Sequence, residues 1–373
     1  MAIIAINALN SNSGGGKSIR DSYLKLLNQK LLEERYVVIT SCRNDLDFID
    51  NPSIDIKLVP HFWSWTFLAP FVYRFALGRL LHAIRADVLL NIGDLIVHTS
   101  AKQIYVFDWP YALDVHPKVW AGMNSLDWFN RRLKLWLIRS SFHKPDIVVA
   151  QTHFIRQRLK ELYSLSDIRV INNAVTINNS QNDEVSHPFL PPGPKLLCPS
   201  VYYPHKNLEI LLELALLIKQ AGSNLYIVTT VDPYNYASRR FLDLIIEREL
   251  QGVILNIGQV SLDRMQDIYS QCDALLLPTL LESFSIVYLE AMYYGLPILT
   301  SDMWFAKAVC GHAAMYFDPF DAEDILHSID NVMSDSTTRA KLIEAGLHRL
   351  SSFPTWEQNF TTYQRYLDEL LAT

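Results

Sequence analysis

The stretch Pro278-Thr-Leu-Leu-Glu282-Ser-Phe-Ser-Ile-Val-Tyr-Leu-Glu290-Ala-Met-Tyr-Tyr-Gly295-Leu-Pro297 decides the fold of this chain. The apolar run from Ala274 to Leu277 predicts a buried strand before it, and the Gly-Leu-Pro ending is typical of a helix C-terminus. We therefore expect Glu282 in the loop between a strand and a helix, and Glu290 about two turns further along that helix.

Loops at the carboxyl ends of parallel strands are where open α/β sheets bind their ligands. The N–H groups and the dipole at a helix N-terminus favour a phosphate group there. One carboxylate at the mouth and a second one deeper suit a ligand with hydroxyls on both sides of a phosphate, and a nucleotide sugar has that layout. For a lone Glu-x7-Glu, a capped helix with one solvated glutamate is the simpler interpretation.

The run from Leu277 to Ser301 resembles the strand–Glu-x7-Glu–helix signature of glycosyltransferase family 4, whose members have the GT-B fold and retain anomeric configuration. The resemblance implies an α/β protein with two Rossmann-like parallel-sheet domains that face each other across a cleft. Ser285 stands where the family usually has glycine, which implies a tighter approach of the backbone to the ligand. The matching residues are Pro278, Glu282, Ser283, Phe284, Glu290, Ala291, Met292, Gly295, Pro297 and Ser301.

Strand and helix patterns alternate along the whole chain, which predicts parallel sheets. Residues 1–180 form the predicted N-terminal, acceptor-binding domain, with a helix over residues 18–33. The polar, proline-rich segment 176–195 is the predicted linker. Residues 190–355 form the predicted nucleotide-sugar domain, with a helix over residues 207–221. The resemblance implies that a C-terminal helix, at about 356–373, packs back on the first domain.

Composition restricts the class of protein. Half of the 373 residues are hydrophobic and 19% are charged, as in a folded globular protein. Residues 1–185 carry 21 Lys and Arg against 17 Asp and Glu, whereas the remaining residues carry 12 and 22. The sequence has no dense basic patch, so we do not expect it to bind nucleic acid.

The four scattered cysteines form no C-x-x-C pair and indicate reduced thiols in a cytosol. The opening residues 1–6 predict a first strand and not a signal peptide.

Lys206 is the strongest catalytic candidate outside the signature. The segment from Tyr202 to Leu208 follows a predicted strand and resembles the family landmark whose lysine binds the diphosphate. An ammonium group there offsets the charge that grows as the sugar–phosphate bond breaks. Many relatives place an arginine about five residues earlier, where this chain has Val201, so His205 or another group would have to supply a second positive charge. A solvated lysine at a helix start is the alternative.

The first domain offers weaker candidates. The run from Ser13 to Lys17 contains three glycines but has neither Walker A nor dinucleotide-fingerprint spacing, so it is equally a flexible turn. The family loop at this place faces the diphosphate and the acceptor, which makes Gly15 and Gly16 candidates. Phe107 replaces the usual family histidine. Asp108 and His116 complete the set of catalytic candidates with Lys206 and Glu282, although a structural role explains Asp108 and His116 better.

Two further segments bear on ligands. Gly258 and Val260 follow a predicted strand and resemble the family loop that borders the nucleotide base, although Gly258 also fits a plain turn. Asp45-Leu46-Asp47 is a D-x-D triplet, the metal motif of GT-A glycosyltransferases. Because the rest of the chain resembles GT-B enzymes, which require no metal, we assign Asp45 and Asp47 to a solvated loop and expect no metal and no cofactor beyond the donor substrate.

Two aromatic and basic segments predict contact with a membrane. Residues 62–85 are rich in Trp and Phe and carry Arg74, Arg79 and Arg85, which together with their length argue against a transmembrane helix. Residues 128–139 have the basic, Trp-bearing pattern of an interfacial helix. Its cations would meet anionic lipid and are Arg131, Arg132, Lys134 and Arg139. An ordinary core helix with a solvated basic edge explains this pattern equally well.

These observations predict a retaining glycosyltransferase that moves a hexose or deoxyhexose from a nucleotide diphosphate sugar to a hydroxyl of a glycan or lipid-linked acceptor. By resemblance, Lys206 and the helix after Glu282 hold the diphosphate, Glu282 contacts the donor sugar, and Glu290 contacts the ribose. The expected context is bacterial surface polysaccharide synthesis, in the cytoplasm and peripherally on the inner face of the cytoplasmic membrane. A nucleotide-sugar epimerase or hydrolase and a non-catalytic sugar-nucleotide or glycan-binding protein are the alternatives. Within the donor site we include Gly15, Gly16, His205, Lys206, Gly258, Val260, Glu282, Ser283, Phe284, Ser285 and Glu290.

Overall fold

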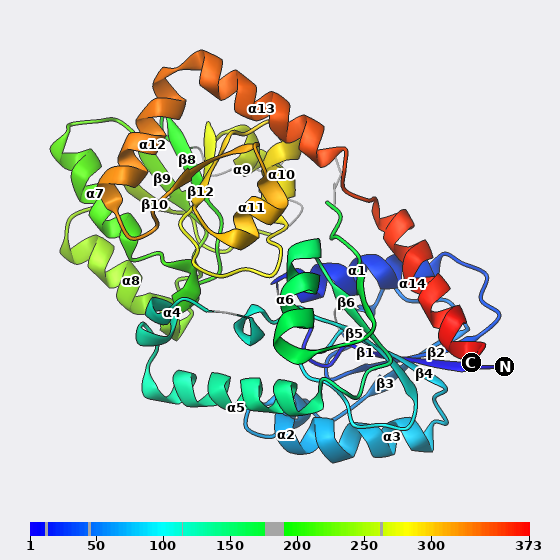
Figure 1. The fold of residues 1–373 in the computed structure, drawn as a ribbon. Helices are drawn as coiled ribbons and strands as arrows, with labels where there is room; N and C mark the ends of the chain where they lie inside the picture. Colours follow the sequence, from blue (N-terminus) through cyan, green and yellow to red (C-terminus); the bar gives the residue numbers. More distant parts are fainter. Residues whose placement is uncertain (12–13, 44–45, 114, 176–189, 262–263) are drawn as a thin grey trace. The chain divides into compact units, whose positions relative to one another are not determined.

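The chain forms two compact units in the computed structural model, which describes residues 1–11, 14–43, 46–113, 115–175, 190–261 and 264–373 (Figure 1). Unit 1 comprises Met1–Val115, Met123–Thr176 and Pro354–Thr373, and unit 2 comprises His116–Gly122 and Ile177–Phe353. Most of the predicted linker, residues 176–189, lies outside the described residues. Sequence placed residues 116–122 in the first domain, whereas the structure groups them with unit 2.

Unit 1 is built on a seven-stranded parallel sheet with the order β3-β2-β1-β4-β5-β6-β7. Its strands are mostly short apolar runs, because helices cover both faces of the sheet. Only β3 was not predicted, since its alternation of buried Ile54 with polar Asp55 and Lys57 is the pattern of an exposed edge strand. The strands are β1 (Ile3–Asn7), β2 (Arg35–Thr40), β3 (Ile54–Leu58), β4 (Val88–Asn91), β5 (Lys102–Val106), β6 (Ile147–Ala150) and β7 (Ile168–Val170).

The helices of unit 1 lie on the two faces of this sheet (Figure 1). On one face α1 and α14 are neighbours, and α3 and α5 lie on the other. The helical elements are α1 (Gly14–Asn28), η2 (His61–Ser64), α2 (Ala69–Phe71), the π-helix η3 (Val72–Ala76), α3 (Leu77–Ala83), η4 (Pro110–Ala112), α5 (Ser125–Ser141), α6 (His153–Tyr163) and α14 (Trp356–Leu371).

The C-terminal helix α14 is part of the core of unit 1. Phe360, Tyr363, Tyr366 and Leu367 are buried in the apolar cluster that also contains α1 and the sheet. The rings of Tyr23 and Phe360 lie 5.2 Å apart. Burial of the apolar surface of each of these large side chains stabilises the fold by on the order of 2 kcal/mol. Unit 1 therefore requires a helix that follows unit 2 in the sequence.

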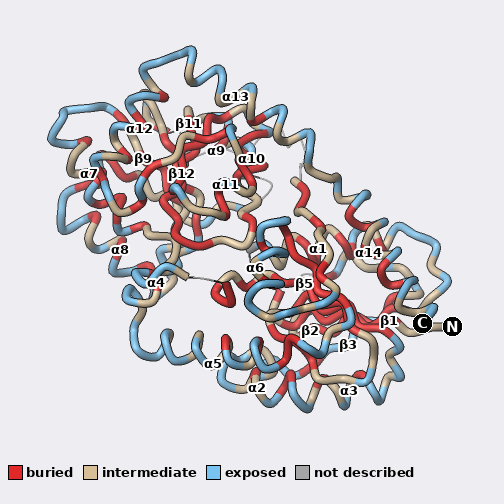
Figure 2. The backbone as a smooth tube through the Cα atoms, viewed as in Figure 1, coloured by how far each residue is buried: buried red, intermediate tan, exposed pale blue. Residues whose placement is uncertain are grey.

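Unit 2 contains a six-stranded parallel sheet with the order β10-β9-β8-β11-β12-β13. Figure 2 shows its strands as buried and the outer sides of its helices as exposed. Helices α7, α8 and α12 cover one face of the sheet, and their apolar side chains form one core cluster with it. The strands are β8 (Lys195–Cys198), β9 (Tyr226–Thr229), β10 (Ile254–Asn256), β11 (Ala274–Leu277), β12 (Ile298–Ser301) and β13 (Ala314–Phe317). The helices are α4 (Pro117–Ala121), η5 (Pro204–Lys206), α7 (Ile210–Gln220), α8 (Tyr236–Glu247), α9 (Met265–Ser270), α10 (Val287–Tyr293), α11 (Trp304–Cys310), α12 (Ala322–Ser334) and α13 (Ser336–Leu350).

Both sheets reverse the direction of their strand order once. In unit 1 the reversal lies between β1 and β4, and in unit 2 it lies between β8 and β11. The loops that leave the carboxyl ends of such a strand pair diverge, and the space between them is the usual ligand site of doubly wound sheets. Lys206 follows β8 and Glu282 follows β11, so the two strongest sequence candidates flank the reversal in unit 2.

Candidate active site

The loop after β8 places Lys206 at the carboxyl edge of the sheet in unit 2. It ends in the short helix η5, and Asn207 follows with φ 55°, a left-handed backbone that asparagine tolerates better than most residues. The Asn207 amide donates hydrogen bonds to the carbonyls of Pro278 (3.1 Å) and Pro319 (2.7 Å). Helix α7 begins at Ile210, three residues later than predicted, because Asn207 anchors the loop instead of starting the helix.

The Lys206 ammonium contacts the Glu282 carboxylate directly, with Nζ 2.5 Å from Oε1. Thr279 donates to the same carboxylate oxygen at 3.0 Å, and the Leu280 N–H donates to the His205 carbonyl at 2.7 Å. The two side chains are 20% and 12% exposed, so they border solvent but are largely shielded from it. Removing either partner would leave the other as a poorly solvated charge. The loops after β8 and β11 are therefore joined to each other by side-chain and backbone contacts at the carboxyl edge of the sheet.

The signature loop after Glu282 explains why the family has glycine at position 285. Ser285 has φ 62°, the left-handed region that costs a residue with a Cβ about 1 kcal/mol. Phe284 is fully buried and packs edge-on against Phe353 at 5.6 Å, so the structure places this predicted donor residue in the core of unit 2. Ser283 is half-buried in the same loop.

Glu290 lies in the first turn of α10 and not two turns into a helix, because that helix begins only at Val287. The Tyr269 hydroxyl, from α9, donates to Glu290 Oε2 at 2.7 Å, and the Tyr269 ring stacks on Tyr294 at 4.9 Å. Burial raises the pKa of the Glu290 carboxyl above its usual value, and the hydrogen bond from Tyr269 partly opposes that rise. The carboxylate is thus held in one orientation, which suits it to accept hydroxyl groups.

Three other predicted donor residues, His205, Gly258 and Val260, belong to loops at the same edge of unit 2. The His205 ring stacks on Tyr203 at 5.4 Å and 10°. Gly258 follows β10 with φ 75°, which requires glycine, and Val260 is half-buried two residues further on.

In unit 1 the structure brings Asp108 to the glycine run. Helix α1 begins at Gly14, four residues earlier than predicted, so Gly15 and Gly16 belong to its first turn and not to a loop. A Cβ built on Gly16 would lie 3.5 Å from Asp108 Oδ2. The Gln151 amide donates to Asp108 Oδ1 at 2.9 Å. A carboxylate is favourable at a helix N-terminus, and that of Asp108 lies beside the first turn of α1.

The remaining first-domain candidates have packing partners. His116 is exposed, accepts the Lys118 N–H as the N-cap of α4, and its ring lies 4.9 Å from that of Phe320 within unit 2. Phe107 is fully buried and packs on Phe142, so the position of the usual family histidine belongs to the core.

Lys134 contradicts the predicted lipid-facing role. Its ammonium donates to Asp94 at 2.6 Å and lies 4.6 Å from the Trp109 ring centre. Burial lowers the pKa of Lys134, and Asp94 opposes that shift. Arg131 likewise turns inward, over the Tyr111 ring at 4.5 Å. These two cations therefore pack on the protein, whereas Arg132 and Arg139 are exposed.

The described ranges also bear on metal binding and on membrane insertion. Among those residues no group of three or more His, Cys, Asp or Glu side chains is arranged to hold a metal ion, Asp47 is exposed, and Asp45 and Ser13 lie outside them. In the same ranges no helix combines the length and apolarity needed to cross a bilayer.

Comparison with known families agrees with this geometry. Residues 23–179 match the family model described as Glycosyltransferase Family 4, and residues 179–349 match the one described as Glycosyl transferases group 1. The chain belongs to this family of glycosyltransferases. The Glu-x7-Glu signature and the Lys206 loop both lie within the second match.

Two curated relatives of this glycosyltransferase are named O-antigen chain mannosyltransferases. RfbU of Salmonella typhimurium is 24% identical over 200 residues, which are 53% of this chain and 54% of that protein. Mannosyltransferase B of Escherichia coli is 26% identical over 307 residues, which are 76% of this chain and 77% of that protein. The chain thus matches about half the length of the first relative and about three quarters of the second.

Solved structures show that the glycosyltransferase has the GT-B fold. Sucrose-phosphate synthase from Thermosynechococcus elongatus superposes with a TM-score of 0.74 at 16% identity over 100% of both chains. Anabaena HepE, solved in complex with UDP and glucose, superposes with a TM-score of 0.68 at 14% identity over 99% of this chain and 100% of that one.

Sequence reasoning found the charged residues of the site but missed their supports. Thr279, Asn207, Tyr269 and Gln151 each hold a candidate side chain or its loop. Thr279 and Asn207 had a signal, since Thr279 lies inside the signature and Asn207 lies inside the landmark from Tyr202 to Leu208. The others come from separate elements, and sequence spacing does not show which of them meet.

Proposed function

We propose that the protein transfers a sugar from a nucleotide diphosphate donor to a hydroxyl of a glycan or lipid-linked acceptor, with retention of anomeric configuration. The observation that carries this proposal is the 2.5 Å contact between Lys206 and Glu282 across the two loops at the strand-order reversal of unit 2. The UDP and glucose in the HepE complex support a nucleotide-sugar donor. Two relatives named O-antigen mannosyltransferases make mannose the first sugar to test and surface polysaccharide synthesis the proposed context.

In the proposed reaction the bond between the anomeric carbon and the diphosphate oxygen breaks, and the acceptor oxygen bonds to the same face of the sugar. The acceptor proton moves to the leaving phosphate oxygen. Lys206 stabilises the negative charge that grows on that phosphate, because its ammonium is already held in place and shielded from bulk water. Glu282 orients Lys206 and accepts sugar hydroxyls, and Glu290 accepts the ribose hydroxyls. No step requires a metal or another cofactor.

The experiment is a panel of UDP-, GDP-, ADP- and dTDP-sugars, measured first by thermal shift and then by transfer to glycan acceptors. Stabilisation by one donor followed by retained-configuration product supports the proposal. Consumption of the donor without an acceptor would identify a hydrolase or epimerase instead. Calorimetric binding with zero turnover across the acceptor panel would identify a non-catalytic binding protein.

We also propose that unit 1 binds an anionic membrane peripherally, on the inner face of the cytoplasmic membrane. The support is a set of exposed aromatic residues, the aromatic face, with exposures from 44% for Trp128 to 66% for Phe67. Exposed Arg74, Arg79, Arg132 and Arg139 lie on the same segments. The aromatic face consists of Phe62, Trp65, Phe67, Phe71, Phe75, Trp128, Phe129 and Trp136.

Sedimentation with phosphatidylglycerol vesicles at low salt tests the membrane proposal. Binding that is lost in a Phe75→Ser, Trp136→Ser double variant supports it, since both aromatic side chains are exposed and their removal leaves the core intact. Equal recovery with anionic and with neutral phosphatidylcholine vesicles contradicts it.

A further inference from the structure

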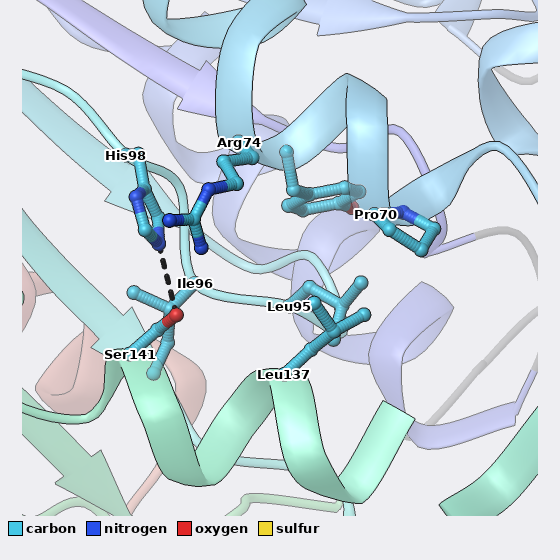
Figure 3. Close-up of a pocket in the computed structure, with 8 residues that line it drawn as sticks. Pro70, Arg74, Leu95, Ile96, His98, Leu137 and Ser141 are labelled. Atoms are coloured by element: carbon cyan, nitrogen blue, oxygen red, sulfur yellow. Dashed lines mark hydrogen bonds between the residues drawn. The ribbon is translucent and has the colours of Figure 1, made fainter. Parts of the chain in front are cut away.

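We propose that a small pocket in unit 1, between η3 and α5, binds the phosphate of an anionic phospholipid headgroup. The inference deepens the proposed membrane contact and rests on it. Figure 3 shows the pocket, with Pro70, Leu95, Ile96 and Leu137 as apolar walls and Arg74, His98 and Ser141 as its polar groups. Nothing in the proposed sugar transfer uses these residues.

The polar groups of the pocket converge. His98 Nε2 lies 2.9 Å from the Ser141 hydroxyl oxygen, and Ser141 is almost fully buried at 4% exposure. The Arg74 side chain extends toward the His98 ring (Figure 3). A guanidinium, an imidazole and a hydroxyl are the donors that proteins use for phosphate oxygens.

The pocket carries an excess of positive charge. Burial lowers the pKa of His98, and the cationic groups of Lys144, Arg74 and His143 lower it further. Among the described residues, neither Arg74 nor Lys144 forms an ion pair with a carboxylate. Because the lowered pKa leaves the His98 ring neutral at pH 7, the positive charge at the pocket is that of Arg74, and a bound phosphate would pair with it.

The backbone around His98 is fixed before any ligand binds. The His98 N–H donates to the Tyr73 carbonyl of the π-helix at 3.0 Å, and a Cβ on Gly78 would lie 2.2 Å from the His98 carbonyl oxygen. The buried Gln103 side chain binds both the N–H and the carbonyl of Val97 next to it. Such π-helical turns are frequent at functional sites, and this one also places Val72 and Tyr73 in the core of unit 1.

The surroundings favour a lipid over a free anion. Phe71 and Phe75, whose ring centres lie 5.6 Å apart, are sequence neighbours of the lining residues Pro70 and Arg74, and Trp136 precedes Leu137 on α5. All three aromatic side chains are exposed. If these rings enter the headgroup boundary of a bilayer, the pocket lies at the depth of the lipid phosphates. A free phosphate ion gains nothing from the apolar rim.

The test compares variants in sedimentation with phosphatidylglycerol and phosphatidylcholine vesicles. Arg74→Gln and His98→Gln each remove one phosphate donor, and we expect an affinity for phosphatidylglycerol vesicles about tenfold lower. Arg79→Gln removes the same charge from the neighbouring helix α3, outside the pocket, and is the matched control. We expect it to weaken binding much less, and we expect recovery with phosphatidylcholine vesicles to be unchanged in all three variants.

A second readout separates the pocket from general charge. Two-dimensional NMR of the His98 ring should show its pKa rising when a short-chain phosphatidylglycerol is added, and a smaller rise with inorganic phosphate at the same concentration. Equal losses in Arg74→Gln and Arg79→Gln, or equal shifts with both phosphates, would overturn the inference. The inference would also be overturned if the wild-type protein did not bind anionic vesicles, and that outcome would contradict the membrane proposal as well. Sugar transfer to a soluble acceptor, measured on the same variants, is independent of both and should not change.

Discussion

The carboxyl edges of the two sheets share one topology but present opposite chemistry. In unit 2 the loops on either side of the strand-order reversal bring together Lys206 and Glu282. In unit 1 the carboxylate of Asp108 lies against the first turn of α1. An ammonium at the edge suits a diphosphate, whereas a carboxylate on a helix N-terminus repels one and suits hydroxyl groups. The topology sets the place of a ligand, and the side chains decide which ligand it is.

The largest expected effect on the difference between the two edges comes from substitution of Lys206. Lys206→Ala should lower the transfer rate at least about 100-fold, because it removes the charge that stabilises the leaving phosphate. Steady-state kinetics with the preferred donor measure this loss, and circular dichroism checks the fold. Lys219→Ala, an exposed lysine on α7, is the matched control. Near-normal turnover of Lys206→Ala would contradict the proposal that Lys206 of unit 2 stabilises the leaving phosphate.

Asp108 tests whether the unit 1 edge serves the acceptor. Asp108→Ala should raise the acceptor KM about tenfold, the cost of losing a charged hydrogen-bond acceptor. Nucleotide affinity, measured by calorimetry, should stay within about twofold because that ligand belongs to the other unit. Asp108→Asn keeps an oxygen for the Gln151 amide and should recover part of the loss. A weaker nucleotide affinity in Asp108→Ala would contradict the assignment of the nucleotide to unit 2 and of the acceptor to unit 1.

The buried carboxylate of unit 2 predicts a dependence of stability on pH. The pKa of Glu290 is raised from 4.5 in the folded protein, so the folded state holds this proton to a higher pH than the unfolded chain does. Its contribution to the free energy of unfolding is therefore fully present below pH 4.5 and is lost as pH rises through the raised pKa. Urea unfolding should show that the stability of Glu290→Gln rises relative to that of wild type as the pH increases from 4 to 7.

Glu213→Gln controls for the loss of a carboxylate as such, since Glu213 lies on the exposed side of α7. Its stability difference from wild type should stay nearly constant over the same pH range. A parallel response of the two variants would show that burial does not set the behaviour of Glu290.

The smallest effect concerns the left-handed residue of the signature loop. Ser285→Gly should raise the free energy of unfolding by about 0.5 kcal/mol, because glycine adopts this backbone without strain but loses more entropy on folding. Ser285→Ala keeps the strain and should give no gain. Thermal unfolding of the three proteins measures the difference, and a Gly variant less stable than the Ala variant would contradict the assignment.

Sequence predicted the parts of the fold that local patterns encode. The apolar runs predicted most strands of the two sheets, and the long signature predicted the family, but β3, β12 and β13 were not predicted. The edge strand β3 was not predicted because Asp55 and Lys57 interrupt its apolar pattern. Helix α1 was predicted to begin too late, since three glycines are poor helix formers and only the packed carboxylate of Asp108 shows why they are there.

The partners of buried charges could not be predicted in the same way. Lys134 and Arg131 lie on a helix whose pattern indicated a basic outer surface. They pack instead on Asp94, in the loop after β4, and on Tyr111, in η4. The same limit applied to Tyr269, which fixes Glu290 from a different helix. Such contacts depend on how loops fold over strand ends, and a single sequence does not encode that in any short pattern.

The position of α14 has a consequence for biosynthesis. Because Phe360, Tyr363 and Leu367 complete the core of unit 1, that unit cannot finish folding on the ribosome until Trp356–Leu371 has emerged. The strands of unit 2 are translated earlier and can pair while the first seven-stranded sheet still lacks one of its covering helices. Chaperones that protect nascent chains would therefore be needed longest for the segment that is synthesised first.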